Sequence, residues 1–248
     1  MTTQFYLKDD WRRRTLACIT SAKSQWKKGK LDYAYLELFG RSGFAMYDVL
    51  RDYLPHRAGR TEHFIGIDHR PEVLLDALLD RTPNFPLYFG DAFADVPLLF
   101  KEGRRIGTVM LDTTNGTRPS WWQGKRESLR SIAAEGARVC PTFLLMLNHT
   151  LTRGHEKGTT LRERIRAHAG AVASTFSLWG LEAASLTEGL DEGLAALPLA
   201  RGGSTEAGAF DIYRSEDHTL YMITVRLVFE ARRGRAYGHR FGKQGTKP

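Results

Sequence analysis

Continuous apolar segments, each closed by glycine, proline or a charged residue, divide the first 150 residues into regular units. Five of these segments are short enough to be strands, and they cover residues 33–39, 63–68, 87–89, 106–111 and 142–147. Unbroken apolar runs, rather than alternating ones, are typical of strands that are buried on both faces of a sheet. The pattern therefore predicts five interior strands.

Segments with helical periodicity fill the intervals between the predicted strands. They cover residues 10–28, 44–53, 72–80, 125–135 and 160–181. Gly29 ends the first helix, as a residue that tolerates positive φ often does, and Pro71 fits the first turn of the third. Strands that alternate with helices predict a parallel sheet with helices on both faces.

The end of the chain breaks this alternation. A stretch rich in glycine and alanine over residues 188–208 is expected to form a loop. Two apolar segments, 209–213 and 220–229, follow with a short polar connection, which requires an antiparallel hairpin because a parallel return needs a longer crossover. The expected fold is α/β, Rossmann-like and doubly wound, with a mainly parallel seven-stranded sheet that ends in an antiparallel hairpin.

The length of 248 residues suits one α/β domain with short appendages. We expect a basic helix over residues 1–30, one domain over 31–232 and a basic, flexible tail over 233–248. Cys18 and Cys140 stand far apart and outside any metal-ligand spacing, so neither a disulfide framework nor a metal site is expected. The polar start and the lack of a long apolar run lead us to expect a cytoplasmic protein without membrane contact.

The formal net charge is +8, with 36 Lys and Arg residues against 28 Asp and Glu residues. This excess favours an anionic partner, above all nucleic acid. Basic residues gather in the helix over 10–28 and in the tail, where no acidic residue follows Glu230. Both segments could lie along a phosphate backbone, while solvated basic faces and a disordered, solubilising tail are the competing interpretations.

Acidic residues stand where four of the predicted parallel strands end. In chain order they are Glu37, Asp68, Asp91 and Asp112, and a glycine turn follows the first of them. Open α/β sheets bind their ligands beyond the carboxyl ends of the strands. The sequence therefore predicts a ligand site at this edge.

The order of these strand-end residues, with the segment Glu-Leu-Phe-Gly-Arg-Ser-Gly over 37–43, resembles the motifs of class I, Rossmann-like S-adenosylmethionine-dependent methyltransferases. The likeness covers residues 31–150. It implies a cofactor, S-adenosylmethionine, held at its amino-acid end by the first motif, which comprises Glu37, Phe39, Gly40, Arg41 and Gly43. Arg41 stands where the family has glycine, so its side chain could crowd the cofactor or reach its carboxylate.

The same resemblance gives roles to the other strand-end residues. Asp68 would accept both ribose hydroxyls, and Asp91 would meet the adenine amine with Ala92 beside the ring. Asp112 would face the methyl donor and, with Asn115, orient the methyl acceptor. Family members that methylate amino groups of nucleic acids carry two prolines and an aromatic residue after the first position of this motif, and this chain lacks them.

Several residues near the predicted site of the methyl acceptor have more than one interpretation. The pair Trp121-Trp122 could stack on a base or simply pack in the core. His149, predicted just past the fifth strand, and His155 in the following loop are candidate acid/base groups, although alignment alone can also catalyse the transfer. Cys140 precedes a proline, which is the reverse of the order needed for cytosine C5 chemistry, so that reaction is excluded.

The chain is also loosely similar to the partner proteins of three-Cys-motif enzymes, which share a basic N-terminal helix. The resulting hypothesis is a methyltransferase that acts on nucleic acid or on a nucleic-acid-associated substrate. Two alternatives stay open. One is a catalytically inactive binding protein of the same fold, with Arg41 in the methionine pocket, and the other is a small-molecule or protein methyltransferase.

Overall fold

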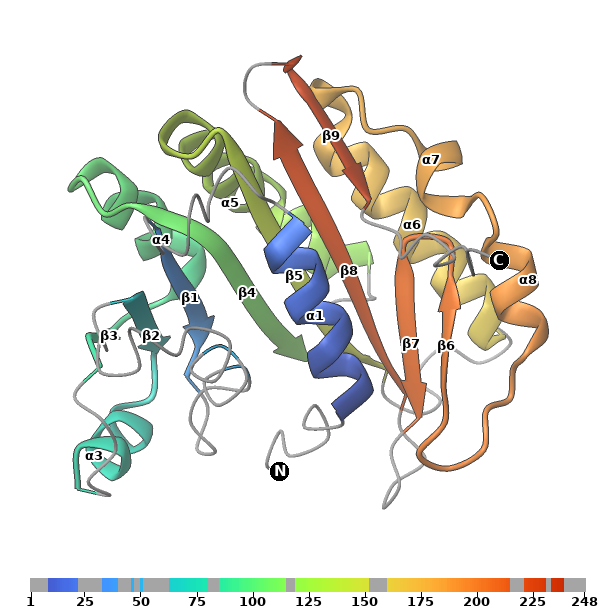
Figure 1. Cartoon of the computed structure of the whole chain (residues 1–248), viewed down its shortest axis with the longest axis horizontal. Coiled ribbons are helices and arrows are strands. Elements are labelled where there is room, and N and C mark those ends of the chain that lie inside the picture. Colours follow the sequence, from blue (N-terminus) through green and yellow to red (C-terminus); the bar gives the residue numbers. More distant parts are fainter. Residues whose placement is uncertain are drawn as a thin grey trace, which may run out of the picture.

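One nine-stranded sheet organises the chain, in the order β3-β2-β1-β4-β5-β8-β7-β6 with β9 beside β8. The structure, a computed structural model, describes residues 9–21, 33–39, 46, 50, 63–79, 85–114, 119–151, 160–214, 221–230 and 233–238. The parallel half consists of β1 (Ala34–Leu38), β2 (Phe64–Asp68), β3 (Leu87–Phe89), β4 (Ile106–Thr114) and β5 (Thr142–Leu151). The antiparallel half consists of β6 (Ser204–Ala207), β7 (Phe210–Arg214), β8 (Tyr221–Glu230) and β9 (Arg235–Gly238) (Figure 1).

This topology confirms the predicted Rossmann-like, doubly wound fold and its antiparallel C-terminal hairpin, formed by β7 and β8. The last two parallel strands are longer than predicted, because their polar ends stay paired. Asp112 is in register with Asn148, and Thr113 with His149. The prediction that Asn148 and His149 lie past the fifth strand was therefore wrong, and both are part of β5.

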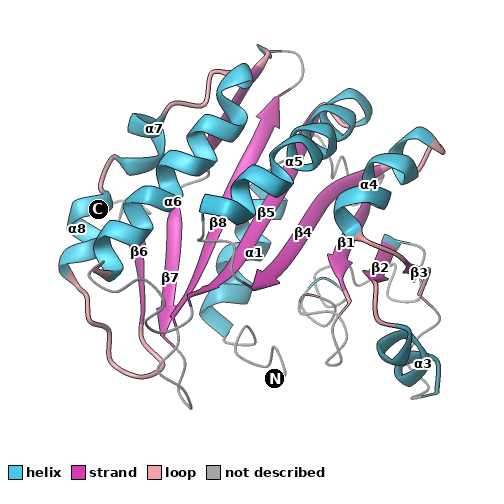
Figure 2. Ribbon diagram, turned by 180° about the vertical axis from the view of Figure 1, so that it is seen from behind, coloured by secondary structure: helices cyan, strands magenta, loops and turns pink. Residues whose placement is uncertain are grey.

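One face of the sheet is covered by a layer of three long helices (Figure 2). These are α4 (Ala92–Lys101), α5 (Pro119–Val139) and α6 (Leu161–Phe176), followed by the short α7 (Ala183–Thr187) and α8 (Leu190–Ala195). Apolar side chains of β4, β5 and β8 that point to this face, such as Leu111, Leu147 and Val225, form the larger of the two core clusters.

The other face carries α1 (Asp9–Ser21), which lies across β5 and β8 (Figure 1). The fully buried Arg226 of β8 fixes this helix, since its guanidinium donates to Asp211 of β7 and to the Thr15 hydroxyl of α1. Arg14 of α1 adds an ion pair of 3.1 Å with Asp211. The predicted basic helix is thus present, but Arg14 and Thr15 bind the sheet, and residues 22–32 lie outside the described part of the chain.

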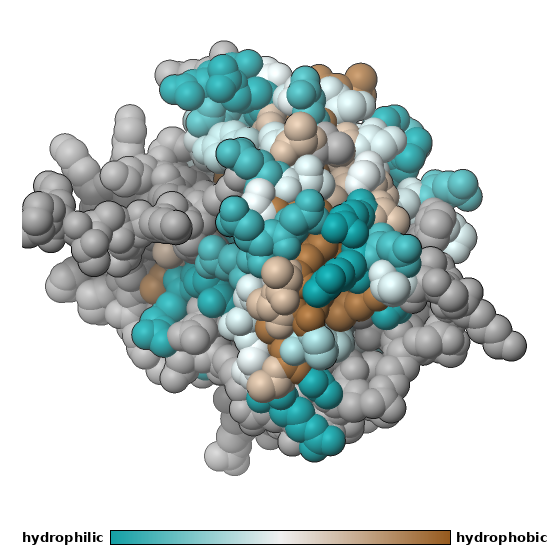
Figure 3. All heavy atoms as spheres, turned by 90° about the vertical axis from the view of Figure 1, so that its right-hand side faces the viewer, coloured by the Kyte–Doolittle hydropathy of each residue, from teal (hydrophilic) through white to brown (hydrophobic). Residues whose placement is uncertain are grey.

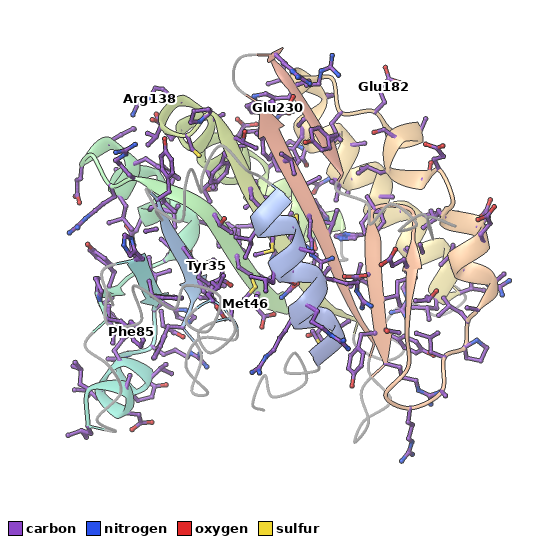
Figure 4. All side chains as sticks on the ribbon, viewed as in Figure 1. Tyr35, Met46, Phe85, Arg138, Glu182 and Glu230 are labelled. Carbon is purple, nitrogen blue, oxygen red and sulfur yellow. The ribbon has the colours of Figure 1, made fainter. Side chains whose placement is uncertain are left out.

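A second apolar cluster fills the space on the α1 side, next to the parallel strands. Tyr35, Met46 and Phe85 belong to it (Figure 4). The helix α3 (Pro71–Leu79) follows β2 and begins at Pro71, as predicted. Of its residues, only Val73 is buried.

The prediction of a loop over residues 188–208 was wrong, because this segment contains α8 and β6. Its small residues allow close packing of these two elements. A Cβ on Gly193 of α8 would overlap the carbonyl oxygen of Glu206 and the Cα of Ala207 in β6. Figure 3 views this side of the molecule and shows hydrophilic residues around a band of hydrophobic ones.

Two further boundaries differ from the prediction. The helix expected over 160–181 ends earlier, as α6 gives way to a 3-10 turn (Ser177–Trp179) and then to Gly180 at φ 71°. The tail expected to be flexible begins with β9, which pairs with the second half of β8. The sheet has nine strands rather than seven because β6 and β9 were not predicted.

Candidate functional site

The carboxyl ends of β1, β2 and β4 meet at one edge of the sheet. β1 pairs in parallel with β2 on one side and with β4 on the other, so the strand order reverses between β1 and β4. Connections that diverge at such a point leave a crevice, which is where open α/β sheets bind ligands. Glu37, Asp68 and Asp112 belong to these three strands, so the fold brings them to this end of the sheet.

Glu37 is buried below the edge, with 3% of its surface exposed. The Tyr35 hydroxyl donates to its carboxylate over 2.9 Å. Burial, and then the Glu37 charge, raise the pKa of Tyr35 well above its usual value, so Tyr35 remains a donor. Glu37 is therefore held by a residue of its own strand, and its carboxylate lies in the interior beneath the carboxyl edge of the sheet.

Phe39 directly follows the strand β1. It is 2% exposed, and its N–H donates to the Ile67 carbonyl over 3.0 Å. The other members of this predicted motif, Gly40, Arg41 and Gly43, lie outside the described residues, so their cofactor contacts stay predictions.

Asp68 ends β2 and is engaged by a neighbour in sequence. The Arg70 guanidinium donates from Nε to Oδ1 over 3.0 Å and from Nη2 to Oδ2 over 2.7 Å, and the Arg70 N–H adds a bond of 2.9 Å to Oδ1. Burial raises the pKa of Asp68, but the hydrogen bonds from Arg70 outweigh it and lower the pKa below its usual value. Asp68 is thus an ionised hydrogen-bond acceptor, and in this structure Arg70 is its hydrogen-bond donor.

Asp91 stands at the beginning of α4 and has an accessible carboxylate. Its Oδ1 accepts the Phe93 N–H over 2.9 Å, which caps the helix, and its Oδ2 lies 3.6 Å from Lys125 Nζ. Lys125 Nζ also lies 4.4 Å from the centre of the Phe93 ring. Ala92, by contrast, is 3% exposed and belongs to the core cluster. The Asp91 carboxylate thus lies at the surface next to Lys125, whereas Phe93 is buried, with 8% of its surface exposed.

Asp112 of β4 is half-buried and begins a row of polar side chains on the α1 side of the sheet. Asn148 is its register partner on β5, and Thr224 is the register partner of Asn148 on β8. The Thr224 hydroxyl donates to Asn148 Oδ1 over 2.5 Å, whereas the buried Asn148 Nδ2 has no hydrogen-bond partner. Asn115, the other predicted acceptor-orienting residue, lies outside the described residues.

His149 points to the opposite face and is fully buried. Its Nδ1 is 2.8 Å from the Thr113 hydroxyl, and its ring meets that of His168 of α6 edge to face at 4.7 Å. Burial, and then His168, lower the pKa of His149 well below 6.5. His149 is therefore neutral and shielded from solvent, which argues against its role as an acid/base group, one of the interpretations given above. His155 lies outside the described residues.

The tryptophan pair lies at the start of α5 and packs into the interior. Trp122 is 2% exposed and contacts both histidine rings, at 5.9 Å from His149 and 5.4 Å from His168. Trp121 is partly buried and packs edge to face on Phe93 at 5.7 Å. The interpretation of core packing is thus correct for Trp122, and the pair does not form an open stacking platform.

The described part of the chain holds no group of three or more His, Cys, Asp or Glu residues placed to bind a metal. Cys18 and Cys140 are both buried and neither forms a disulfide, and burial raises the pKa of Cys18 to about 12. No helix among these residues is long and apolar enough to cross a membrane.

Comparisons with known proteins gave no match to any family model or curated protein. Among solved structures, TrmN from Thermus thermophilus is 10% identical over 89% of this chain and 48% of its own, with a TM-score of 0.39. The fibrillarin pre-rRNA processing protein of Methanococcus jannaschii is 12% identical over 86% of this chain and 74% of its own, with a TM-score of 0.41. The SAM-dependent methyltransferase from Agrobacterium tumefaciens is 14% identical over 62% of this chain and 49% of its own, with a TM-score of 0.34.

This chain thus spans about half the length of the first and third of these proteins, at 48% and 49%. Likenesses this distant transfer no activity to it. Its fold follows from the strand order and the antiparallel hairpin. The fold is the Rossmann-like fold of class I methyltransferases.

Proposed function

We propose that the chain is an S-adenosylmethionine-dependent methyltransferase that binds its cofactor across the carboxyl edge of the parallel strands. The supporting observation is that three carboxylates from separate elements lie along the carboxyl edge of the parallel strands, on both sides of the point where the strand order reverses. They are Asp68 at the end of β2, Asp91 at the start of α4 and Asp112 near the end of β4.

Each carboxylate has a chemically distinct task in this proposal. Asp68, ionised and nearly buried, accepts the ribose hydroxyls, and the exposed Asp91 accepts the adenine amine beside Phe93. The cofactor, when bound, supplies a methyl group on a positively charged sulfur. Asp112 accepts a hydrogen bond from the acceptor's N–H or O–H and so aims its lone pair at that methyl group.

The methyl acceptor that we propose is nucleic acid or a nucleic-acid-associated substrate. The net charge of +8 supports it, since it favours a polyanionic partner. Arg13 of α1 is exposed at the surface. A small-molecule or protein acceptor remains the alternative for the same site.

A transfer assay tests the activity and the acceptor class together. The protein is incubated with S-adenosylmethionine labelled on the methyl group and, separately, with bulk RNA, duplex DNA and protein. We expect label in a nucleic-acid fraction, and Asp112→Asn is expected to lower the rate by roughly 100-fold, because an amide is a poorer acceptor for the attacking group. Asp191→Asn on α8 is the control, since Asp191 is exposed and pairs with Arg166.

Label in the protein fraction alone would overturn the nucleic-acid assignment while keeping the activity. A binding protein without turnover is the second candidate function, and one observation favours it: Asp68 is already occupied by Arg70. Absence of cofactor binding, together with absence of transfer to any acceptor, would support that candidate.

A further inference from the structure

The Asp68 carboxylate has almost no hydrogen-bonding capacity left. It accepts three hydrogen bonds from Arg70, one from the backbone N–H, one from Nε and one from Nη2. An ionised carboxylate offers about four acceptor positions, so about one remains. A ribose diol needs two acceptor positions, one for each hydroxyl, and cannot find them while the guanidinium is bound.

Steric access leads to the same conclusion. The Asp68 side chain is only 5% exposed, whereas the Arg70 side chain that binds it is 44% exposed. The guanidinium is therefore the more accessible partner of this ion pair, and solvent or a ligand can reach it more easily than the carboxylate.

The backbone around Arg70 is fixed on both sides, so only its side chain is free to move. Arg70 lies between β2 and α3, and its carbonyl accepts the Val73 N–H of the first helical turn over 3.2 Å. If the side chain leaves, the bond from the Arg70 N–H keeps Oδ1 oriented and the two positions held by the guanidinium become free. These two positions are the number that a diol requires.

We propose that Arg70 is a side-chain gate on Asp68, whose guanidinium must leave the carboxylate before the cofactor's ribose diol can bind there. This inference rests on the proposed function. Cofactor binding then exchanges an ion pair for two hydrogen bonds from uncharged hydroxyl groups to the same carboxylate. Arg70 therefore weakens cofactor binding and makes it depend on ionic strength.

Titration calorimetry with S-adenosylhomocysteine tests this exchange, because this product analogue has no net charge of its own. For the wild type, we expect the affinity to rise by about twofold between about 50 mM and about 500 mM salt, since salt weakens the ion pair that must break. For Arg70→Ala, we expect binding that is about two- to fivefold tighter at low salt and insensitive to salt. Arg70→Lys keeps the charge without the two-pronged contact and should lie between the two.

The matched control is Arg138→Ala. Arg138 donates to Glu135 over 2.9 Å at the C-terminal end of α5, on the opposite side of the molecule from Phe85 and α3 (Figure 4). This variant also removes an exposed arginine from an ion pair, and we expect it to bind as the wild type does.

A second readout is the pH dependence of binding. In Arg70→Ala the guanidinium no longer lowers the pKa of Asp68, while burial still raises it and the backbone N–H of residue 70 and His69, whose Nδ1 lies 3.8 Å from Oδ1, still lower it. The pKa of Asp68 should therefore be higher than in the wild type, and Arg70→Ala should lose affinity on acidification at a higher pH. Equal or weaker binding by Arg70→Ala at pH 8 would overturn the gate and leave the proposed function intact. No binding by the wild type or by any variant would overturn both.

Discussion

At the scale of single residues, the unusual feature of the described part of the chain is a cluster of buried side-chain nitrogen atoms without hydrogen-bond partners. His168 has no partner at either ring nitrogen, and His149 Nε2 and Trp122 Nε1 also lack one. Their rings contact one another between α5, β5 and α6. Buried polar atoms without partners destabilise a fold, so this cluster connects protonation to stability.

The cluster predicts a loss of stability on acidification. Burial lowers the pKa of His168 to about 3 and the pKa of His149 well below 6.5, whereas both titrate near 6.5 when unfolded. Below pH 6.5 the unfolded chain therefore binds more protons than the folded one. The free energy of unfolding should fall by up to about 1.4 kcal/mol per pH unit for each histidine.

Urea unfolding between pH 6.5 and pH 5 measures this slope. In His168→Phe, which replaces the ring by one that cannot titrate, the slope should be about half that of the wild type if both histidines contribute equally. An unchanged slope in this variant would show that His168 is not the buried, neutral group described above.

At the scale of elements, the packing of α8 on β6 depends on two small residues. Gly193 faces Ala207 so closely that no Cβ fits between the two elements. Because glycine and alanine are so frequent in residues 188–208, the segment has the composition of a loop, although it contains the helix α8 and the strand β6.

Gly193→Ala is therefore expected to destabilise the protein by about 1–3 kcal/mol, because the overlap with the backbone of β6 forces the elements apart. Gly170→Ala on α6 is the matched control, as nothing lies within 4 Å of its added methyl group. That control should stabilise the helix by about 0.5–1 kcal/mol, since alanine is the better helix former. Thermal unfolding of both variants checks the prediction, and similar effects at the two sites would contradict it.

At the scale of the whole molecule, the sequence predicted the parallel half of the sheet better than the antiparallel half. The interior strands β1, β2, β4 and β5 are marked by continuous apolar runs, since the two core clusters cover both faces of this part of the sheet. The prediction that all five parallel strands are interior was wrong for β3, which is the edge strand and leaves Phe89 67% exposed. β6 and β9 carry no such signal, because β6 is short and mostly exposed or half-buried and β9 alternates in burial. The helix α4 was not predicted either, although Asp91 is a favourable N-cap residue. Pro97 lies inside this helix, and proline in a sequence usually indicates the end of a helix.

The candidate site was predictable only in part. The acidic strand ends follow from the change from apolar to polar residues, so Asp68, Asp91 and Asp112 could be found in the sequence. The contacts that each carboxylate makes could not be found in the sequence. The ion pair of Arg70 with Asp68 depends on a side-chain conformation, and the burial of His149 depends on how far β5 extends.

Thermal melting with and without the cofactor tests the central claim most directly. A ligand that binds only the folded state stabilises it by about 2.7 kcal/mol at a hundred times its dissociation constant. We predict that S-adenosylmethionine and S-adenosylhomocysteine each raise the melting temperature of the wild type, and that Asp68→Ala abolishes both shifts while Asp191→Ala keeps them. No shift of the wild type at millimolar ligand, or an equal shift in Asp68→Ala, would contradict a cofactor site at this edge.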